Sequence, residues 1–282
     1  MKTAIVTDST AYIPGELREQ WNIQMIALQV ILGNKVFREE VDIGSQVFFE
    51  KVRHQKELPT TSQPPVGEFV TLFEKLAADG YTAVISIHLS SGISGTFQGS
   101  VTAGSMVEGI AVYPFDSEIS CMVQGFYALE AAEMAERGVE PEAILDRLEE
   151  LKVTANAYFM VDDLAHLQRG GRLSSTQAFI GSLLQVKPLL HFVNKQIVPF
   201  EKIRTRKKAM KRIGELLGEA VGTADSKYRA VIIHANREAE ALEWKTELES
   251  QYPTVEFSLG YFGAVIGTHL GEGAMGMGWM KK

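Results

Sequence analysis

The sequence of 282 residues is long enough for one large domain or two ordinary ones, and with 45% apolar and 22% charged residues it has the composition of a folded globular protein. Its 35 acidic and 28 basic residues give a formal charge of −7, which argues against holding nucleic acid or an anionic lipid surface through a global positive field. The single cysteine, Cys121, excludes an internal disulfide, and no Cys/His cluster has the spacing of a zinc site.

Neither the N-terminus nor the uncharged stretches indicate secretion or a membrane span. The apolar run before Asp8 is too short for a signal peptide and is typical of a first strand instead. The longest uncharged stretch, residues 81–107, is rich in Ser and Gly and does not supply the roughly 20 apolar residues of a spanning helix. We therefore expect a cytoplasmic protein in a reducing compartment, with no stable membrane insertion.

The first half alternates short β-branched runs with helical periodicity. We predict strands at residues 2–7, 22–32, 35–37, 82–87 and 111–115. We predict helices after Pro14 and at residues 45–55, 66–78 and 127–136. This alternation indicates an α/β fold in which a doubly wound sheet is covered by helices.

A helix at residues 141–152 closes this half, and we place a domain boundary near residue 155. The predicted domains are residues 1–155 and 156–282. The expected elements of the second domain are a strand at 156–161, a helix through 179–184, a hairpin of 189–192 and 196–199, a helix at 206–220, and strands at 229–234, at 254–258 and in the Gly-rich C-terminal segment. Their order predicts an α+β layout with helices on one face of a mixed sheet.

Two hydroxyl-rich loops are candidates for holding an anion. Residues 59–65 place three hydroxyls and an amide between prolines, just before a helix. Residues 89–96 follow the strand at 82–87 and precede a helix, at the strand end where ligands sit in open α/β sheets. The alternative is that these residues only cap helices or form a tight glycine turn. The second loop lacks the spacing of a nucleophile elbow and the Gly-Lys-Ser/Thr of a phosphate-binding loop.

His269 lies among glycines in residues 267–274, where a ligand has access to it, although a lone loop histidine is more often merely solvated. Residues 271–276 match the pattern GxGxxG. Only six residues follow them, which leaves no room for the helix of a dinucleotide site.

Other polar segments have simple structural explanations. The basic run at residues 202–212 fits a solvated helical face or a docking site for an acidic partner or phosphate. Residues 167–172 fit a helix end with a glycine turn. Asp162 and Asp163 fit a helix cap better than a metal pair. Since no Ser/His/Asp set, carboxylate pair or Cys/His pair emerges, the sequence favours a binding protein over a hydrolase.

Seven segments together resemble the DegV family. They are residues 6–10, 60–64, 90–96, 169–172, 187–188, 202–205 and 267–269, and they follow the family's order along nearly the whole chain. The resemblance implies a two-domain α/β protein that encloses one long-chain fatty acid between its domains. It also implies the non-catalytic binding subunit of a bacterial fatty acid kinase in phospholipid metabolism. Such a subunit presents the carboxylate to a separate ATP-using subunit that makes acyl phosphate, and it needs no metal or cofactor itself.

The resemblance also implies site residues. Those that would hold the carboxylate are Thr61, Ser62, Ser94, the amide of Gly95, and His269. Arg204 matches a position implicated near the head group and in productive phosphorylation. This chain has Glu272 where the family usually has proline. We expect this extra carboxylate to raise the pKa of His269 and to repel an anionic head group.

Two alternative functions of other classes stay open. One is a stand-alone enzyme acting on a small phosphorylated or carboxylated substrate through Asp8, His269 and Arg204, with a metal at Asp8 or Asp162. The other is a DNA-binding regulator that works through residues 202–212, which the acidic total disfavours.

Overall fold

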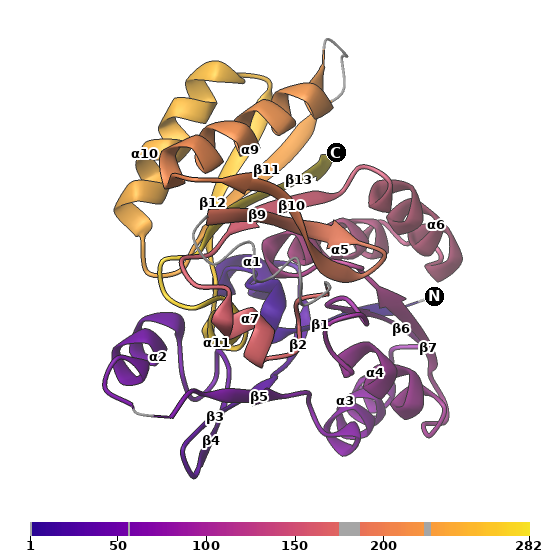
Figure 1. Cartoon of the computed structure of the whole chain (residues 1–282). Coiled ribbons are helices and arrows are strands. Elements are labelled where there is room, and N and C mark those ends of the chain that lie inside the picture. The colour runs from indigo at the N-terminus through magenta and orange to yellow at the C-terminus, as the bar shows by residue number, and fades with distance from the viewer. Residues whose placement is uncertain (1, 56, 175–186, 223–226) are drawn as a thin grey trace.

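The computed structural model describes residues 2–55, 57–174, 187–222 and 227–282 (Figure 1). The α/β fold class predicted from the sequence is confirmed. A parallel sheet is built from the first half of the chain and a separate mixed sheet from the second. The predicted helix through residues 179–184 lies outside the described residues.

The parallel sheet has the strand order β2-β1-β6-β7. Its strands are β1 (Thr3–Asp8), β2 (Gln24–Ile26), β6 (Ala83–His88) and β7 (Ala111–Asp116). All three pairings are parallel, so the carboxyl ends of β1 and β6 meet at one edge. The helices of this half are α1 (Gly15–Gln20), α2 (Ser45–Val52), α3 (Val66–Ala78), α4 (Thr96–Gly104), α5 (Cys121–Glu136) and α6 (Pro141–Lys152).

The predicted strand at residues 22–32 is wrong as a single element. It is divided between β2 and β3 (Gln29–Leu32), and β3 belongs to a third, small antiparallel sheet with the order β4-β3-β5. Its other strands are β4 (Lys35–Arg38) and β5 (Thr60–Ser62). The chain thus leaves one sheet and enters another around the apolar run of residues 25–28, where the pattern gives no sign of a break.

The mixed sheet has the strand order β10-β9-β8-β13-β11-β12. Its strands are β8 (Asn156–Met160), β9 (Lys187–Val193), β10 (Gln196–Ile203), β11 (Tyr228–His234), β12 (Val255–Tyr261) and β13 (Met275–Lys281). The predicted hairpin is confirmed, since β9 and β10 are joined at Asn194 and Lys195, which both have positive φ. The helices of this half are α7 (Ala165–Arg169), α9 (Arg206–Val221), α10 (Glu238–Gln251) and α11 (Ala264–Leu270).

Both faces of the mixed sheet are buried, and successive residues of β11 show it. Ala230 and Ile232 pack in a cluster with residues of α9 and α10, which cover the outer face of the sheet (Figure 1). Val231 and Ile233 point the other way, into a core shared with α5 and the first half. One hydrophobic core therefore runs across the two halves.

α11 reaches from the second half into the first. It contacts α2, β3 and β5 as well as α7. The buried carboxylate of Glu39 accepts hydrogen bonds from the backbone N–H of Val265 at 2.7 Å, from Ser9 Oγ at 2.6 Å and from Tyr12 Oη at 2.9 Å. This carboxylate fixes the start of the short helix that carries His269. Within the described ranges, no helix has the length and apolar character needed to cross a bilayer.

Candidate functional site

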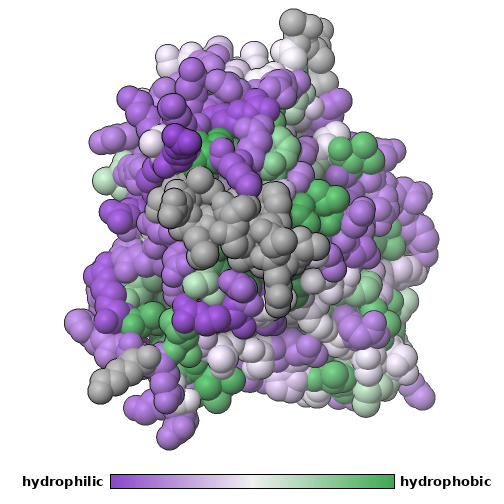
Figure 2. All heavy atoms as spheres, viewed as in Figure 1, coloured by the Kyte–Doolittle hydropathy of each residue, from purple (hydrophilic) through white to green (hydrophobic). Residues whose placement is uncertain are grey.

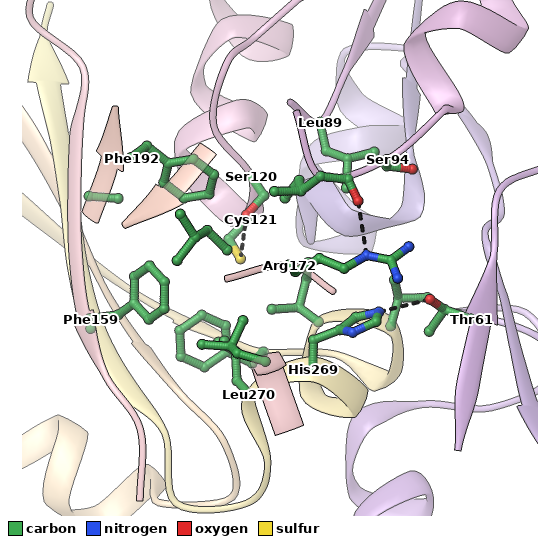
Figure 3. Close-up of a pocket in the computed structure, with 18 of the residues that line it drawn as sticks. Thr61, Leu89, Ser94, Ser120, Cys121, Phe159, Arg172, Phe192, His269 and Leu270 are labelled. Atoms are coloured by element: carbon green, nitrogen blue, oxygen red, sulfur yellow. Dashed lines mark hydrogen bonds between the residues drawn. The ribbon is translucent and has the colours of Figure 1, made fainter. Parts of the chain in front are cut away.

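A cavity of about 270 Å³ lies between the loops of the first half and the mixed sheet (Figure 3). This approaches the range of roughly 300–1,000 Å³ for small-molecule sites. Its lining is mainly apolar and includes Leu28, Leu89, Ile93, Cys121, Phe159, Leu167, Phe192, Ile197, Ile233, Phe262, Val265, Ile266, Leu270 and Met277. The face seen in Figure 2 is mostly hydrophilic, with scattered hydrophobic patches.

The polar groups of the cavity gather at one side of it. Thr61, Ser94, Arg172 and His269 lie there in Figure 3, and Phe159 and Phe192 lie at the opposite side. Ser62, Gln63 and Gly95 also line the cavity. The site is therefore polar at one end and mainly apolar along the rest.

Thr61 and His269 form a hydrogen-bonded pair. Thr61 on β5 and His269 on α11 place Oγ1 and Nε2 2.8 Å apart, and no residue in the described part of the chain pairs with His269 Nδ1. A Cβ on Gly170 would lie 2.3 Å from Nδ1, so the ring presses on backbone there. Thr61 and His269 therefore share one hydrogen bond, in which either side chain can be the donor.

The expectation for Glu272 is wrong. Burial, Arg172 and His166 lower the pKa of His269 to about 4, so its imidazole is neutral near pH 7. Glu272 turns away after the left-handed Gly271 and pairs with Arg53, which holds the pKa of the carboxyl below its ordinary value. Asn236 Nδ2 donates a further hydrogen bond to it at 2.7 Å. The carboxylate is neutralised elsewhere and does not charge the cavity.

Ser94 and Gly95 lie in the loop between β6 and α4, directly before the start of α4. Ser94 Oγ accepts the backbone N–H of Thr96 at 3.3 Å and lies 2.9 Å from Thr96 Oγ1. Ser94 therefore bonds to local backbone, as the capping alternative predicts, and it also lines the cavity. Gly95 packs against Gln63, whose Oε1 would lie 2.0 Å from any added Cβ. Gly95 thus lets the two hydroxyl loops meet.

A buried network anchors the start of the Ser94 loop. Asp8 Oδ2 accepts from Leu89 N, His88 Nδ1 and Gln124 Nε2, each at 3.0 Å. His88 Nε2 lies 2.7 Å from Ser86 Oγ, so a Ser-His-Asp chain of hydrogen bonds exists that the sequence analysis missed. None of these three side chains lines the cavity, and Ser86 and His88 have no exposed surface. The chain is structural, because a nucleophile must reach its substrate.

Arg172 is the site residue that sequence reasoning missed. The prediction of a helix end with a glycine turn is confirmed, since α7 ends at Arg169 and Gly171 has φ +68°. The chain beyond the turn brings the Arg172 guanidinium into the cavity, where Nε donates to the carbonyl of Ile93 at 3.2 Å. Burial lowers the pKa of Arg172, but this strong base stays charged. The cavity thus holds a cation that the sequence analysis did not include.

Two expected site residues are less central. Ser62 lines the cavity, but its hydroxyl donates to Gln29 Oε1 at 3.0 Å. Arg204 is exposed between β10 and α9 and does not line the cavity.

The residues suggested for other functions do not converge. Asp8 is buried in its network, Arg204 is exposed, and only His269 lines the cavity. Asp163 Oδ1 accepts the N–H of Ala165 at 2.8 Å, which confirms the cap reading, and the described residues contain no cluster of three metal-ligating side chains. In the basic run, Arg206 pairs with Glu240 and Arg212 with Glu201, so part of its charge is neutralised.

Comparison with known proteins places the chain in a family. The family model described as "Uncharacterised protein, DegV family" matches residues 2–282. Protein DegV of Bacillus subtilis is 63% identical over all of both chains, and a DegV domain-containing protein of Listeria innocua is 52% identical over 100% of this chain and 99% of its own.

Solved structures agree with this placement. The crystal structure of DegV from Bacillus subtilis, described as a fatty acid binding protein, superposes with a TM-score of 0.95 over all of both chains, at 63% identity. A fatty acid binding DegV family protein from Streptococcus agalactiae has a TM-score of 0.92 at 33% identity over 100% of this chain and 99% of its own. A structure described as fatty acid binding of a DegV family protein from Thermus thermophilus has a TM-score of 0.93 at 30% identity over all of both chains. Fold, cavity and sequence together identify the chain as a member of the DegV family.

Proposed function

We propose that this protein binds one long-chain fatty acid in the cavity, between domains that divide near residue 155. The observation that carries the proposal is the polarity of the cavity, which has hydrogen-bond donors at one end and apolar walls along the rest. Solved relatives described as fatty acid binding proteins support it.

The tail supplies most of the affinity. A C16 chain has about 14 methylenes, and burial of each is worth about 0.8 kcal/mol, so the transfer of the tail contributes on the order of 11 kcal/mol. Cavity walls of Phe, Leu, Ile and Val side chains provide the surface for it. The head group then sets the orientation.

The carboxylate lies at the polar end, held by Ser94, Thr61 and the amide of Gly95, with Arg172 as the counter-charge. His269 is neutral near pH 7 and acts through Thr61, because the hydrogen bond between them holds the Thr61 side chain at the polar end of the cavity. Ser62 completes the rim of this group. No carboxylate in the described ranges pairs with Arg172, so the head group does not have to break a buried ion pair between these residues.

The protein acts as a non-catalytic, cytoplasmic subunit that presents the carboxylate to a separate kinase for acyl phosphate formation. Supporting this role, Asp8, His269 and Arg204 do not assemble a reaction centre. Arg204 is exposed outside the cavity, where a partner protein has access to it.

Denaturing extraction of the purified protein followed by mass spectrometry should release about one fatty acid per chain. The delipidated protein should then bind added palmitate or oleate with the same stoichiometry. A protein that is empty after purification and also rejects both acids would contradict the proposal. Formation of acyl phosphate, trapped by hydroxylamine, should require a kinase subunit and ATP together with this protein.

Replacing Ser94 by alanine should weaken palmitate binding by about 1–3 kcal/mol, the range for a hydrogen bond to a charged group. The matched control is Ser91→Ala in the same loop, because the Ser91 hydroxyl donates to Asp116 and does not line the cavity. Titration calorimetry with palmitate and with uncharged methyl palmitate separates the head-group effect from general damage. Equal palmitate affinities for Ser94→Ala and Ser91→Ala would remove Ser94 from the site.

A further inference from the structure

A second pocket, of about 180 Å³, adjoins the cavity at the end opposite the polar group. Three residues line both spaces: Ala157, Tyr158 and Phe192. Phe192 lies across the cavity from Thr61 and His269 in Figure 3. A single layer of side chains therefore separates the second pocket from the tail end of the cavity.

The second pocket differs from the cavity in chemistry. Its polar lining residues include Ser117, Glu118, Lys152, Asn156, His191, Asn194 and Lys195. Lys152 and Lys195 both form ion pairs with Glu118, at 3.6 and 3.8 Å. Tyr127 also lines this pocket, is fully buried, and has no hydrogen-bond partner for Oη anywhere in the described ranges. Such a lining disfavours an alkyl chain, because a methyl end placed there displaces solvent from charged and unpaired groups.

The two aromatic residues that line both spaces point to opposite faces of the mixed sheet. The ring of Tyr158 stacks on His191 and Trp279, with centroids 5.4 and 5.5 Å away, in the cluster that α9 and α10 cover, so it does not stand between the two spaces. Phe192 packs on the inner core, where its ring contacts that of Phe159 with centroids 6.3 Å apart. It lies on β9 close to the hairpin turn, which is anchored where Ser90 Oγ donates to the carbonyl of Lys195 at 2.6 Å. Phe192 is therefore the large side chain between the two spaces, and a substitution there changes the size of the wall directly.

We propose that Phe192 is the end wall of the acyl site and sets the longest chain that the protein holds. The proposal rests on the proposed fatty acid function. Up to the wall, each added methylene is buried and raises affinity by up to about fourfold. Beyond the wall, the chain has to fold back in the cavity or enter the polar pocket, so the gain in affinity stops.

The test is a chain-length profile, with affinities for saturated acids from C12 to C22 measured by competition against a fluorescent fatty acid. In Phe192→Ala, the chain length at which affinity stops rising should move up by at least two carbons relative to the wild-type protein. Phe159→Ala is the matched control, since Phe159 lines the cavity but not the second pocket. It should change affinities at every length and leave the break in the profile in place.

A larger side chain tests the wall in the opposite direction. Phe192→Trp should move the break down by about two carbons, and this variant decides the matter if Phe192→Ala fails to fold by circular dichroism. The same break in the wild-type protein and in every folded Phe192 variant, or an equal shift in Phe159→Ala, would overturn the proposal. Absence of any fatty acid binding by the wild-type protein would instead refute the proposed function, so the two failures are distinguishable.

Discussion

Replacing Asp8 by alanine is expected to lower the free energy of unfolding by about 3–5 kcal/mol, the range for removing one member of a buried charged network. The carboxylate is 1% exposed and accepts hydrogen bonds from Leu89, His88 and Gln124 on one oxygen. Its other oxygen accepts from the backbone N–H and the hydroxyl of Thr10, at 3.0 and 2.6 Å. Alanine leaves the N–H groups of Leu89, Thr10 and His88 without this acceptor in a place that water does not reach. The Thr10 hydroxyl and Gln124 Nε2 keep a second acceptor, at Gln124 Oε1 and Thr7 Oγ1.

Urea unfolding followed by circular dichroism measures this effect. The control is Asp42→Ala, because Asp42 pairs with Arg38 on the surface and its loss should leave the unfolding midpoint nearly unchanged. Asp8→Asn keeps the shape and retains one acceptor oxygen, so it should fall between the wild-type protein and Asp8→Ala. An unfolding midpoint for Asp8→Ala equal to that of Asp42→Ala would show that the network does not stabilise the fold.

The second large effect concerns pH and the carboxyl of Glu39. Burial raises its pKa from 4.5 to about 7, and the hydrogen bonds from Ser9, Val265 and Tyr12 only partly offset this rise. Because the folded protein holds this proton more tightly than the unfolded chain, the stabilisation is complete below pH 4.5 and is lost as pH rises through 7. The expected loss is on the order of 3 kcal/mol.

Glu39→Gln removes the titrating group and keeps the size of the side chain. As pH increases from 4.5 to 8, the unfolding free energy of the wild-type protein should fall relative to that of Glu39→Gln. The exposed Asp42 provides the opposite sign, because Arg38 lowers its pKa and its stabilising effect is therefore present at high pH. If the unfolding free energies of the wild-type protein and Glu39→Gln differ by the same amount across this range, then the pKa of Glu39 is not raised by folding.

Local patterns predicted much of the fold. The strand β6, the hairpin turn at Asn194 and Lys195 and the helix end before Gly170 are set by neighbouring residues, and all were predicted. The start of α5 was not. This helix begins at Cys121, several residues before the predicted start, and Cys121 has a φ of +62° that no propensity suggests for a cysteine.

The parts of the site that sequence reasoning missed depend on distant contacts. Glu272 was expected to act on its neighbour His269, but it pairs with Arg53, which is 219 positions away. Ser86 and His88 share one side of β6, yet their link to Asp8 requires the pairing of β6 with β1. Arg172 enters the cavity because of the path that the chain takes after Gly171. The spacing of these residues along the sequence does not predict any of these contacts.

The hydrophobic core that crosses both halves restricts how the proposed ligand could reach the cavity. Val231 and Ile233 of the mixed sheet belong to the same cluster as Phe126 of α5 and Phe49 of α2. Separating the two halves would expose all of this apolar surface to water, at a free-energy cost of about 25 cal/mol for each Å². We therefore expect the proposed ligand to enter without disruption of this shared core, so that substitutions at the cavity rim change its exchange rate more than substitutions in the core.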